Sequence, residues 1–227
     1  MNKTDFIVIP GTNDAISRSV VATGNNFQNA HFEINEYSIN NVGLVVPSIK
    51  KFMKYFLSVK EATFGVKKLY TLDNKQIPPD EVEELWGHWA SNLYSLPNIY
   101  LSNHIIQDIN GRFYNACDFR IFTGVFTEEN IKVLKPIQIN PLEECVMDDV
   151  YVDMIFNKQG FPIKKSRNQT YKEGKNIKFC YPQTDGVISF GYSYKSNETK
   201  LNCQTIKKYS TYEIGVLGYA EGVLPKK

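Results

Sequence analysis

The chain has 227 residues, of which 42% are hydrophobic and 22% are charged, a composition typical of a folded domain that argues against intrinsic disorder. Basic residues exceed acidic ones by only 26 to 24, so the net charge predicts no polyanionic partner. No apolar run approaches the ~20 residues that a membrane helix needs, and Pro10 interrupts the N-terminal apolar stretch too early for a signal peptide. We therefore expect cytoplasmic synthesis, no signal peptide and no membrane span.

The types of basic residue and the spacing of the cysteines exclude further classes of function. Only four of the 26 basic residues are arginines, whose planar forks suit base readout, so we expect no specific recognition of nucleic acid. The abundance of Lys, Asn and Ile is typical of an AT-rich genome, such as that of a phage, a virus or a low-GC bacterium. The cysteines lie far apart without a Cys-x-x-Cys pair, which predicts free thiols and no zinc site: Cys117, Cys145, Cys180 and Cys203.

Residues 1–30 are predicted to form a polar, partly extended segment, and residues 31–227 a single β-rich domain. A short strand at 6–9 is stopped by a Pro-Gly pair, and a loop rich in Ser, Thr and Asn follows. From residue 31 the apolar residues alternate, and their parity changes near Glu36. This pattern predicts two strands separated by a bulge or a break.

Two segments, at about 48–60 and 79–95, have the spacing of amphipathic helices. In the first, apolar residues form one face, lysines surround the other, and Ser48 is in position to cap the N-terminus. In the second, two prolines precede a first turn rich in Asp and Glu, which suits the positive end of the helix dipole. Its apolar stripe contains Trp86 and Trp89. We expect both helices to pack on a sheet; for the first, a face towards a membrane surface or nucleic acid is the alternative.

The rest of the chain has the pattern of short strands separated by turns. Further strands are predicted at 120–126, 132–139, 150–156, 177–181, 187–194 and 209–219. Strands at this spacing, with both helices in the N-terminal half, predict a mainly β, β-rich α+β fold. We expect an antiparallel sandwich or barrel-like body with the two helices packed on one side.

The Asn110-Gly111 pair between two apolar runs predicts a β-hairpin with a two-residue turn. Counting outward from such a turn pairs His104 with Cys117 on one face, together with Asp108 and Asn115. A thiol beside an imidazole and a polar orienting group is the arrangement of an activated cysteine nucleophile. The alternative is that Cys117 is an ordinary buried thiol and that His104 forms its hydrogen bonds elsewhere.

Residues 143–153 contain a local group of acidic side chains: Glu143, Glu144, Asp148, Asp149 and Asp153. Hard metal ions require several oxygen ligands that converge on one point, and the segment lacks the spacing of a calcium-binding loop. Strand alternation would also send Asp148 and Asp149 to opposite faces. We therefore interpret the segment as a solvated acidic patch that contacts a lysine-rich neighbour, with a metal site as the alternative.

The sequence contains no catalytic or cofactor motif, so it assigns no catalytic residue, no cofactor and no metal ligand. This absence, the aromatic residues of the predicted strands and the polar N-terminal segment favour a non-enzymatic structural protein that self-associates into a ring or lattice. The expected setting is a phage or viral particle, with the protein as a connector, tail or capsid subunit located in the virion. The alternatives are a small intracellular enzyme that uses Cys117 and His104, and a β-rich soluble effector or toxin.

Overall fold

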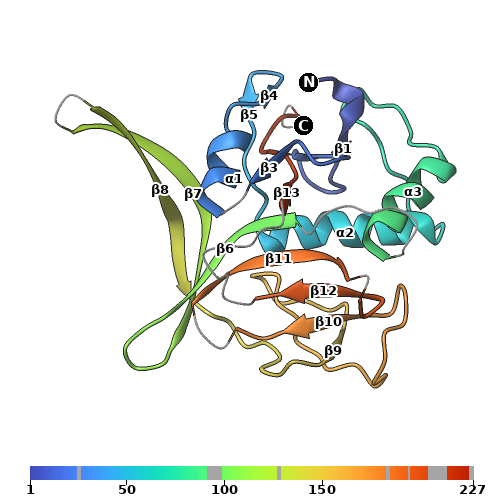
Figure 1. Cartoon of the computed structure of the whole chain (residues 1–227). Coiled ribbons are helices and arrows are strands. Elements are labelled where there is room, and N and C mark those ends of the chain that lie inside the picture. Colours follow the sequence, from blue (N-terminus) through green and yellow to red (C-terminus); the bar gives the residue numbers. More distant parts are fainter. Residues whose placement is uncertain are drawn as a thin grey trace.

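Figure 1 shows the fold as a computed structural model of the whole chain. The structure describes residues 1–24, 27–90, 99–126, 129–182, 185–193, 195–203 and 214–224. Within these ranges the α-helices are α1 (Phe27–Ile34), α2 (Ile49–Thr63) and α3 (Pro79–Ala90). The strands are β1 (Phe6–Val8), β2 (Ala15–Ser17), β3 (Ala22–Gly24), β4 (Ser38–Ile39), β5 (Val42–Gly43), β6 (Ile99–Gln107), β7 (Phe113–Phe126), β8 (Glu129–Pro141), β9 (Tyr151–Asp153), β10 (Asn176–Cys180), β11 (Gly186–Ser193), β12 (Glu198–Asn202), β13 (Ile214–Val216) and β14 (Tyr219–Ala220).

One large sheet forms the centre of the fold, with the strand order β3-β13-β6-β11-β12-β10-β9. Strand β7 also pairs with β6, and β8 pairs with β7. Most neighbours are antiparallel, and the pairs β10–β12 and β13–β6 are parallel. Two small sheets, β1-β2-β14 and β4-β5, complete the described part. The predicted β-rich α+β class is confirmed, and none of these sheets closes into a barrel.

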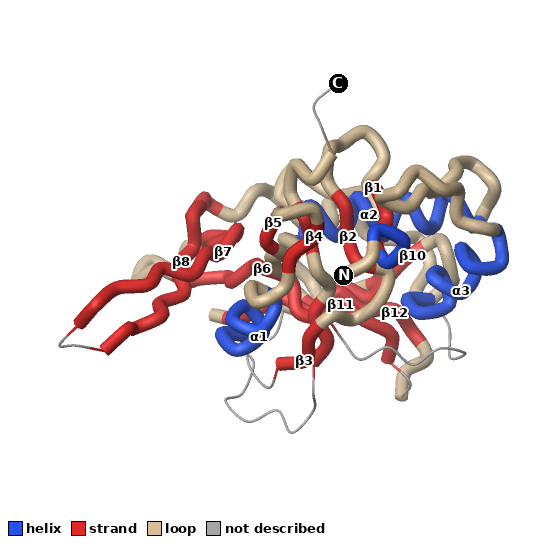
Figure 2. Tube along the Cα trace, turned by 90° about the horizontal axis from the view of Figure 1, so that it is seen from above, coloured by secondary structure: helices blue, strands red, loops and turns tan. Residues whose placement is uncertain are grey.

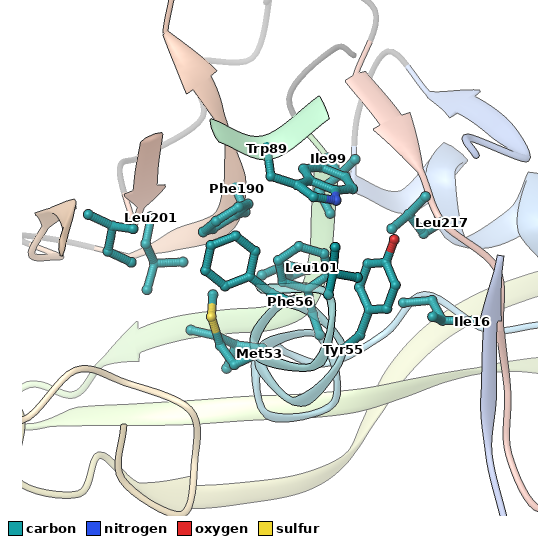
Figure 3. Packing of buried hydrophobic residues seen from close by; sticks show 14 of the residues in the cluster. Ile16, Met53, Tyr55, Phe56, Trp89, Ile99, Leu101, Phe190, Leu201 and Leu217 are labelled. Carbon is teal, nitrogen blue, oxygen red and sulfur yellow. The ribbon is translucent and has the colours of Figure 1, made fainter. Parts of the chain in front are cut away.

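The main hydrophobic core lies between the two longer helices and the central sheet (Figure 3). The rings of Phe52 and Phe56 in α2 and of Trp89 in α3 surround Phe190 of β11, at centroid distances of 4.9, 4.9 and 6.1 Å from its ring. All four side chains are buried, and each such burial contributes roughly 1.5–3 kcal/mol. The core forms here because the apolar residues of each helix recur every three to four positions and so face the sheet along the whole helix.

Both predicted helices are present. Ser48 occupies the N-cap position of α2 with an extended backbone, although its hydroxyl makes no capping hydrogen bond. Helix α3 begins at Pro79, and Trp86 and Trp89 are buried as their stripe predicts. The predicted continuation of this helix over 91–95 lies outside the described residues. Among the described residues, the helices are too short or too polar to cross a membrane.

Residues 27–34 form helix α1, where alternation predicts a strand from residue 31, so this prediction is wrong. Over so few residues an alternating pattern and a helical one fit the same apolar positions. Tertiary contacts decide between them, because His31 and Phe27 lie on one helix face and pack against the ring of Phe119 in β7. The predicted break near Glu36 corresponds to the turn that joins α1 to β4.

The short hairpin β4–β5 follows this turn. Asn40 and Asn41 connect its strands, and both have positive φ, at 51° and 61°. A two-residue hairpin turn requires this conformation, and asparagine adopts it more readily than most residues.

The N-terminal and C-terminal parts of the chain meet in one small sheet. The strand predicted at 6–9 is present as β1, and Ile16 of β2 pairs with Ile7 on one side and with Tyr219 of β14 on the other. The division of the chain into a segment 1–30 and a single domain 31–227 stays a prediction.

The remaining predicted strands are present with shifted ends. Strands β10 and β11 correspond to the predictions at 177–181 and 187–194, and β9 is a shorter form of the one at 150–156. Strands β13 and β14 lie within or next to the predicted strand 209–219, of which residues 209–213 lie outside the described part.

Candidate functional site: a strand arm and the groove at its base

Strands β7 and β8 form a two-stranded arm that extends away from the body of the protein (Figures 1 and 2). They pair antiparallel as far as the last residue of β7, Phe126, which lies opposite Glu129. Strand β6 pairs only with the part of β7 up to Cys117, so beyond that point β8 is the sole sheet partner of β7 among the described residues. We call residues 118–126 and 129–139 the arm.

One face of the arm exposes a stripe of apolar side chains. Val133, Ile137 and Ile139 have the same parity along β8 and are 39%, 54% and 56% exposed. Phe122, which is 47% exposed, is the cross-strand partner of Val133 and therefore shares this face. A two-stranded ribbon has no second layer of its own, so the apolar stripe stays in water unless another molecule covers it.

The base of the arm is packed against α1. Phe119 is buried, and its ring centroid lies 5.1 Å from that of Phe27 and 5.6 Å from that of His31. This contact with a helix fixes the direction in which the arm leaves the body.

Two of the three cations of the arm lie on the same face as the apolar stripe. Lys135 has the parity of the stripe along β8 and Arg120 is its cross-strand partner, whereas Lys132 has the opposite parity. Arg120 lies 3.1 Å from the carboxylate of Glu221, and Lys132 lies 3.4 Å from that of Glu36. The third cation of the arm, Lys135, forms no ion pair with a described residue, and its ammonium lies 6.0 Å from the ring centroid of Phe122. The two acidic residues of the arm lie at its base (position 118) and next to its tip (position 129).

A groove of about 720 Å³ opens at the base of the arm. It is lined by the start of α2, by β6, β7 and β8, by the loops after β8 and β9, and by residues near β1, β2 and β14. The lining is strongly polar, because it contains four lysines, four carboxylates and five side-chain amides. A groove with this lining suits a polar ligand rather than an apolar one.

Two buried asparagines form the floor of this groove. Asn103 on β6 accepts a hydrogen bond from the backbone N–H of Ile49 at 2.6 Å, and its Nδ2 donates to Oδ1 of Asn115 on β7 at 2.7 Å. The first residue of α2 is thereby linked to both strands. A carboxamide suits this position because its oxygen accepts one hydrogen bond while its NH₂ group donates another.

A loop after β9 forms the wall of the groove next to α2. Lys158 and Gln159 of this loop line the groove. Gly160 has a φ of 95° and lies directly against the helix, because a Cβ at this position would be 2.7 Å from the backbone nitrogen of Lys50. A glycine is therefore required both by the backbone conformation and by the close approach to α2.

We expect Gly160→Ala to lower the free energy of unfolding by about 2–4 kcal/mol, since it combines a strained φ with overlap against the helix backbone. Gly11→Ala is the matched control, because Gly11 also has a positive φ, 76°, but nothing lies within 4 Å of its Cβ position. The control should cost about 1–2 kcal/mol. Urea unfolding followed by circular dichroism measures both, and equal losses would show that the loop does not press against α2.

The structure separates His104 from Cys117, so the predicted cysteine–histidine pair is wrong. The hairpin loop is one residue longer than the predicted turn, because Gly111 has a φ of 78° and forms a bulge. Cys117 consequently lies opposite Asn103, and His104 lies opposite Ala116. Because side chains alternate along a strand, this one-residue shift places the imidazole and the thiol on opposite faces.

The environments of the two side chains also differ from those of an activated pair. Cys117 lines the groove, where burial and the carboxylate of Asp118 raise the pKa of its thiol to about 11. His104 lies on the side of Phe27 in α1, with ring centroids 6.2 Å apart, and burial lowers the pKa of its imidazole. The thiol is therefore protonated near neutral pH and has no activation by His104.

The acidic segment 143–153 meets lysines of the same chain. Asp148 pairs with Lys165, and the carboxylate of Asp153 lies 2.9 Å from the ammonium of Lys164. Within the described residues, no three histidine, cysteine or acidic side chains converge in a way that could hold a metal ion. The lysine-rich neighbour that the sequence suggests is thus the segment around residues 164 and 165.

Sequence reasoning located part of this site. It places Asn115 on the same strand face as Cys117, and both residues line the groove. It does not find Asn103, the arm or the groove, because each depends on pairing between distant segments. The sequence signal that could have indicated the arm is a pair of consecutive long strand patterns without a third strand of equal length to pair with them. Comparisons of the chain with protein-family models, with curated proteins and with solved structures found no match.

Proposed function

We propose that the protein is a non-enzymatic structural protein that assembles with further copies of itself through the arm. The observation that carries this proposal is the exposed apolar stripe: Phe122, Val133, Ile137 and Ile139. Covering apolar surface gains roughly 25 cal/mol per Å², and a neighbouring subunit can provide the layer that the ribbon lacks. A phage or viral particle remains the setting that we propose, on the basis of composition.

The surface around α3 is complementary to the arm in charge and also exposes an apolar side chain. Residues 79–90 include four carboxylates and neither lysine nor arginine, and Glu81 of this helix forms an ion pair with Arg18. Beside α3, Phe64 is 59% exposed, and its ring centroid lies 6.2 Å from that of Trp86. The carboxylates of α3 and the exposed ring of Phe64 thus offer an acidic and an apolar contact to an arm face that carries apolar side chains and cations.

The arm and α3 lie on opposite sides of the body in both overall views (Figures 1 and 2). Binding of the arm to α3 of the next copy is therefore a head-to-tail contact. Contacts of this type produce a closed ring when the rotation between copies closes, and a filament when it does not. This geometry supports the expected ring or lattice.

The first test is the native mass of the purified protein, measured by light scattering after size exclusion. We expect the wild type to form a defined oligomer, and Phe122→Ser with Ile137→Ser to weaken association by at least about tenfold, or ~1.4 kcal/mol per contact. Met147→Ser with Ile163→Ser is the control, because these side chains are 68% and 49% exposed outside the arm. Equal weakening by both pairs would contradict a specific role of the arm.

A charge-reversal experiment tests the proposed partner surface. Lys135→Glu on the arm and Glu84→Lys on α3 should each weaken assembly, because each places like charges at the contact. Mixing the two variants should restore association, since the arm of one then meets the α3 of the other with opposite charges. A wild type that remains monomeric at high concentration would overturn the proposal and favour an effector that uses the arm on a different protein.

A further inference from the structure

We propose that the groove at the base of the arm binds a small phosphorylated molecule, through lysines at its edge and hydrogen-bond donors at its floor that have no partner among the described residues. This role goes beyond self-assembly and does not depend on it. The charges, the hydrogen-bond donors and the size of the groove each favour such a ligand.

The carboxylates that line the groove are already satisfied by the protein. Each accepts from a donor of this chain: Asp14 from the Gly222 N–H at 2.8 Å, Asp118 from Lys51 at 3.1 Å, Glu143 from the Lys158 N–H at 3.1 Å, and Glu221 from Arg120 at 3.1 Å. Asp118 and Glu221 are thus paired with cations, and Asp14 and Glu143 are held by backbone donors.

Three of the four lysines, in contrast, form no ion pair within the part of the chain that the structure describes. Lys51 is held by the acidic groups named above, whereas Lys50, Lys54 and Lys158 form no ion pair with any described residue. The same three residues also border a smaller pocket beside the groove, so they lie close together. Three neighbouring ammonium groups without an anion repel one another, and an anion in the groove relieves this repulsion.

The floor of the groove offers two buried donors. Asn115 is 2% exposed; its Oδ1 accepts from Asn103, but its Nδ2 donates to no described residue. Ser48 is 4% exposed, and its hydroxyl likewise has no hydrogen bond with a described residue. Neither donor atom is among the fully buried atoms that lack a partner, so both open onto the groove, and a ligand that brings acceptor oxygens to this floor can bind them.

The position of Ser48 adds to the preference for an anion. It precedes the first residue of the 15-residue helix α2, whose dipole places partial positive charge at this end. A phosphate monoester carries about −1.5 to −2 charge and three acceptor oxygens, which matches several cations and donors better than a single carboxylate does.

The rest of the groove fits the polar part of such a molecule. Gln138 and Asn140 line the groove, are exposed, and form no side-chain hydrogen bond with a described residue. Carboxamides both donate to and accept from hydroxyl groups, so they suit a sugar. The volume of about 720 Å³ lies in the range of small-molecule sites, roughly 300–1,000 Å³.

Calorimetric titration of the full chain with ribose 5-phosphate tests the proposal. We expect saturable binding of ribose 5-phosphate, weaker binding of inorganic phosphate, and no binding of ribose, all at constant ionic strength. The triple variant Lys50→Gln, Lys54→Gln, Lys158→Gln should lose at least about 30-fold in affinity, because each charge-assisted contact is lost. The control triple variant Lys68→Gln, Lys172→Gln, Lys175→Gln removes the same charge from exposed positions elsewhere and should change affinity by less than about twofold.

A second variant tests the floor without changing the edge. Asn115→Asp keeps the acceptor for Asn103 and replaces the unpartnered donor with a negative oxygen, so affinity should fall by about tenfold or more. If this variant fails to fold, as its melting temperature would show, Ser48→Ala provides the same test by removing only the hydroxyl.

Equal losses in the two lysine triple variants, or no binding of either phosphate compound, would overturn the proposal. Phe122→Ser with Ile137→Ser should leave phosphate binding unchanged, which separates this site from self-assembly.

Discussion

Replacing Trp89 with alanine is expected to lower the free energy of unfolding by about 3–5 kcal/mol. The Trp89 side chain is fully buried, and its ring centroid lies 5.5 Å from that of Phe52 and 6.1 Å from that of Phe190. These neighbours belong to α2 and β11, which are packed into the rest of the core, so they cannot move far enough to fill the space. Figure 3 shows Trp89 next to Phe190 in this core. The loss therefore combines the transfer of apolar surface with a residual cavity.

Urea unfolding followed by far-UV circular dichroism measures this loss, since tryptophan fluorescence changes with the substitution itself. Met147→Ala is the control, because that side chain is 68% exposed and should contribute about 0.5 kcal/mol or less. A cost for Trp89→Ala no greater than that of the control would show that α3 does not pack into the core.

We expect the protein to lose stability below about pH 6.5 because of His31. Burial lowers the pKa of this imidazole from 6.5 to about 3 in the folded state. Between these two values the unfolded chain binds a proton at His31 and the folded chain does not. The free energy of unfolding therefore falls as the pH is lowered through this window, by up to ~1.4 kcal/mol per pH unit.

The surroundings of His31 explain why the fold cannot accommodate the charge. The ring centroid of Phe27 lies 4.7 Å from that of His31, and the ring centroid of Phe119 lies 5.6 Å away. Its Nε2 is buried without a partner among the described residues, and the same small pocket is lined by one charged residue, the cation Arg120. No carboxylate in that lining is available to stabilise an imidazolium.

His31→Phe isolates this contribution from that of the carboxylates, which also titrate in acid. When the pH is lowered from 6.5 to 5, the free energy of unfolding of the wild type should fall by about 2 kcal/mol more than that of His31→Phe. His88→Gln serves as the comparison: burial lowers the pKa of this partly buried imidazole as well, but less than that of His31, so its shift should have the same sign and be smaller. A difference between wild type and His31→Phe that does not depend on pH would contradict the burial of a neutral imidazole.

The helices and the fold class could be predicted because their signals are local. The apolar stripe that contains Trp86 and Trp89 repeats at helical spacing over a whole helix, and a pattern of that length fits only one secondary structure. Helix α1 has eight residues, too few for its spacing to exclude a strand, and its packing against Phe119 decided the outcome.

The candidate site was far less predictable, because it depends on register. The Asn110-Gly111 signal correctly indicates a hairpin, but the bulge at Gly111 lengthens the loop by one residue. That single residue moves His104 to the other side of the sheet and leaves Asn103, not His104, opposite Cys117. Local sequence carries little information about a bulge, which forms where the wider sheet fixes the positions of both strands.

By itself, the sequence determined a folded β-rich chain with two amphipathic helices, since composition and short-range periodicity are sufficient for that conclusion. Only the tertiary structure decided that β7 and β8 leave the body as an arm, because this depends on where β6 stops pairing at Cys117. The groove likewise combines residues from Asp14 to Glu221, which are distant in the chain. Both features arise from long-range pairing and packing, which side-chain patterns within one segment do not encode.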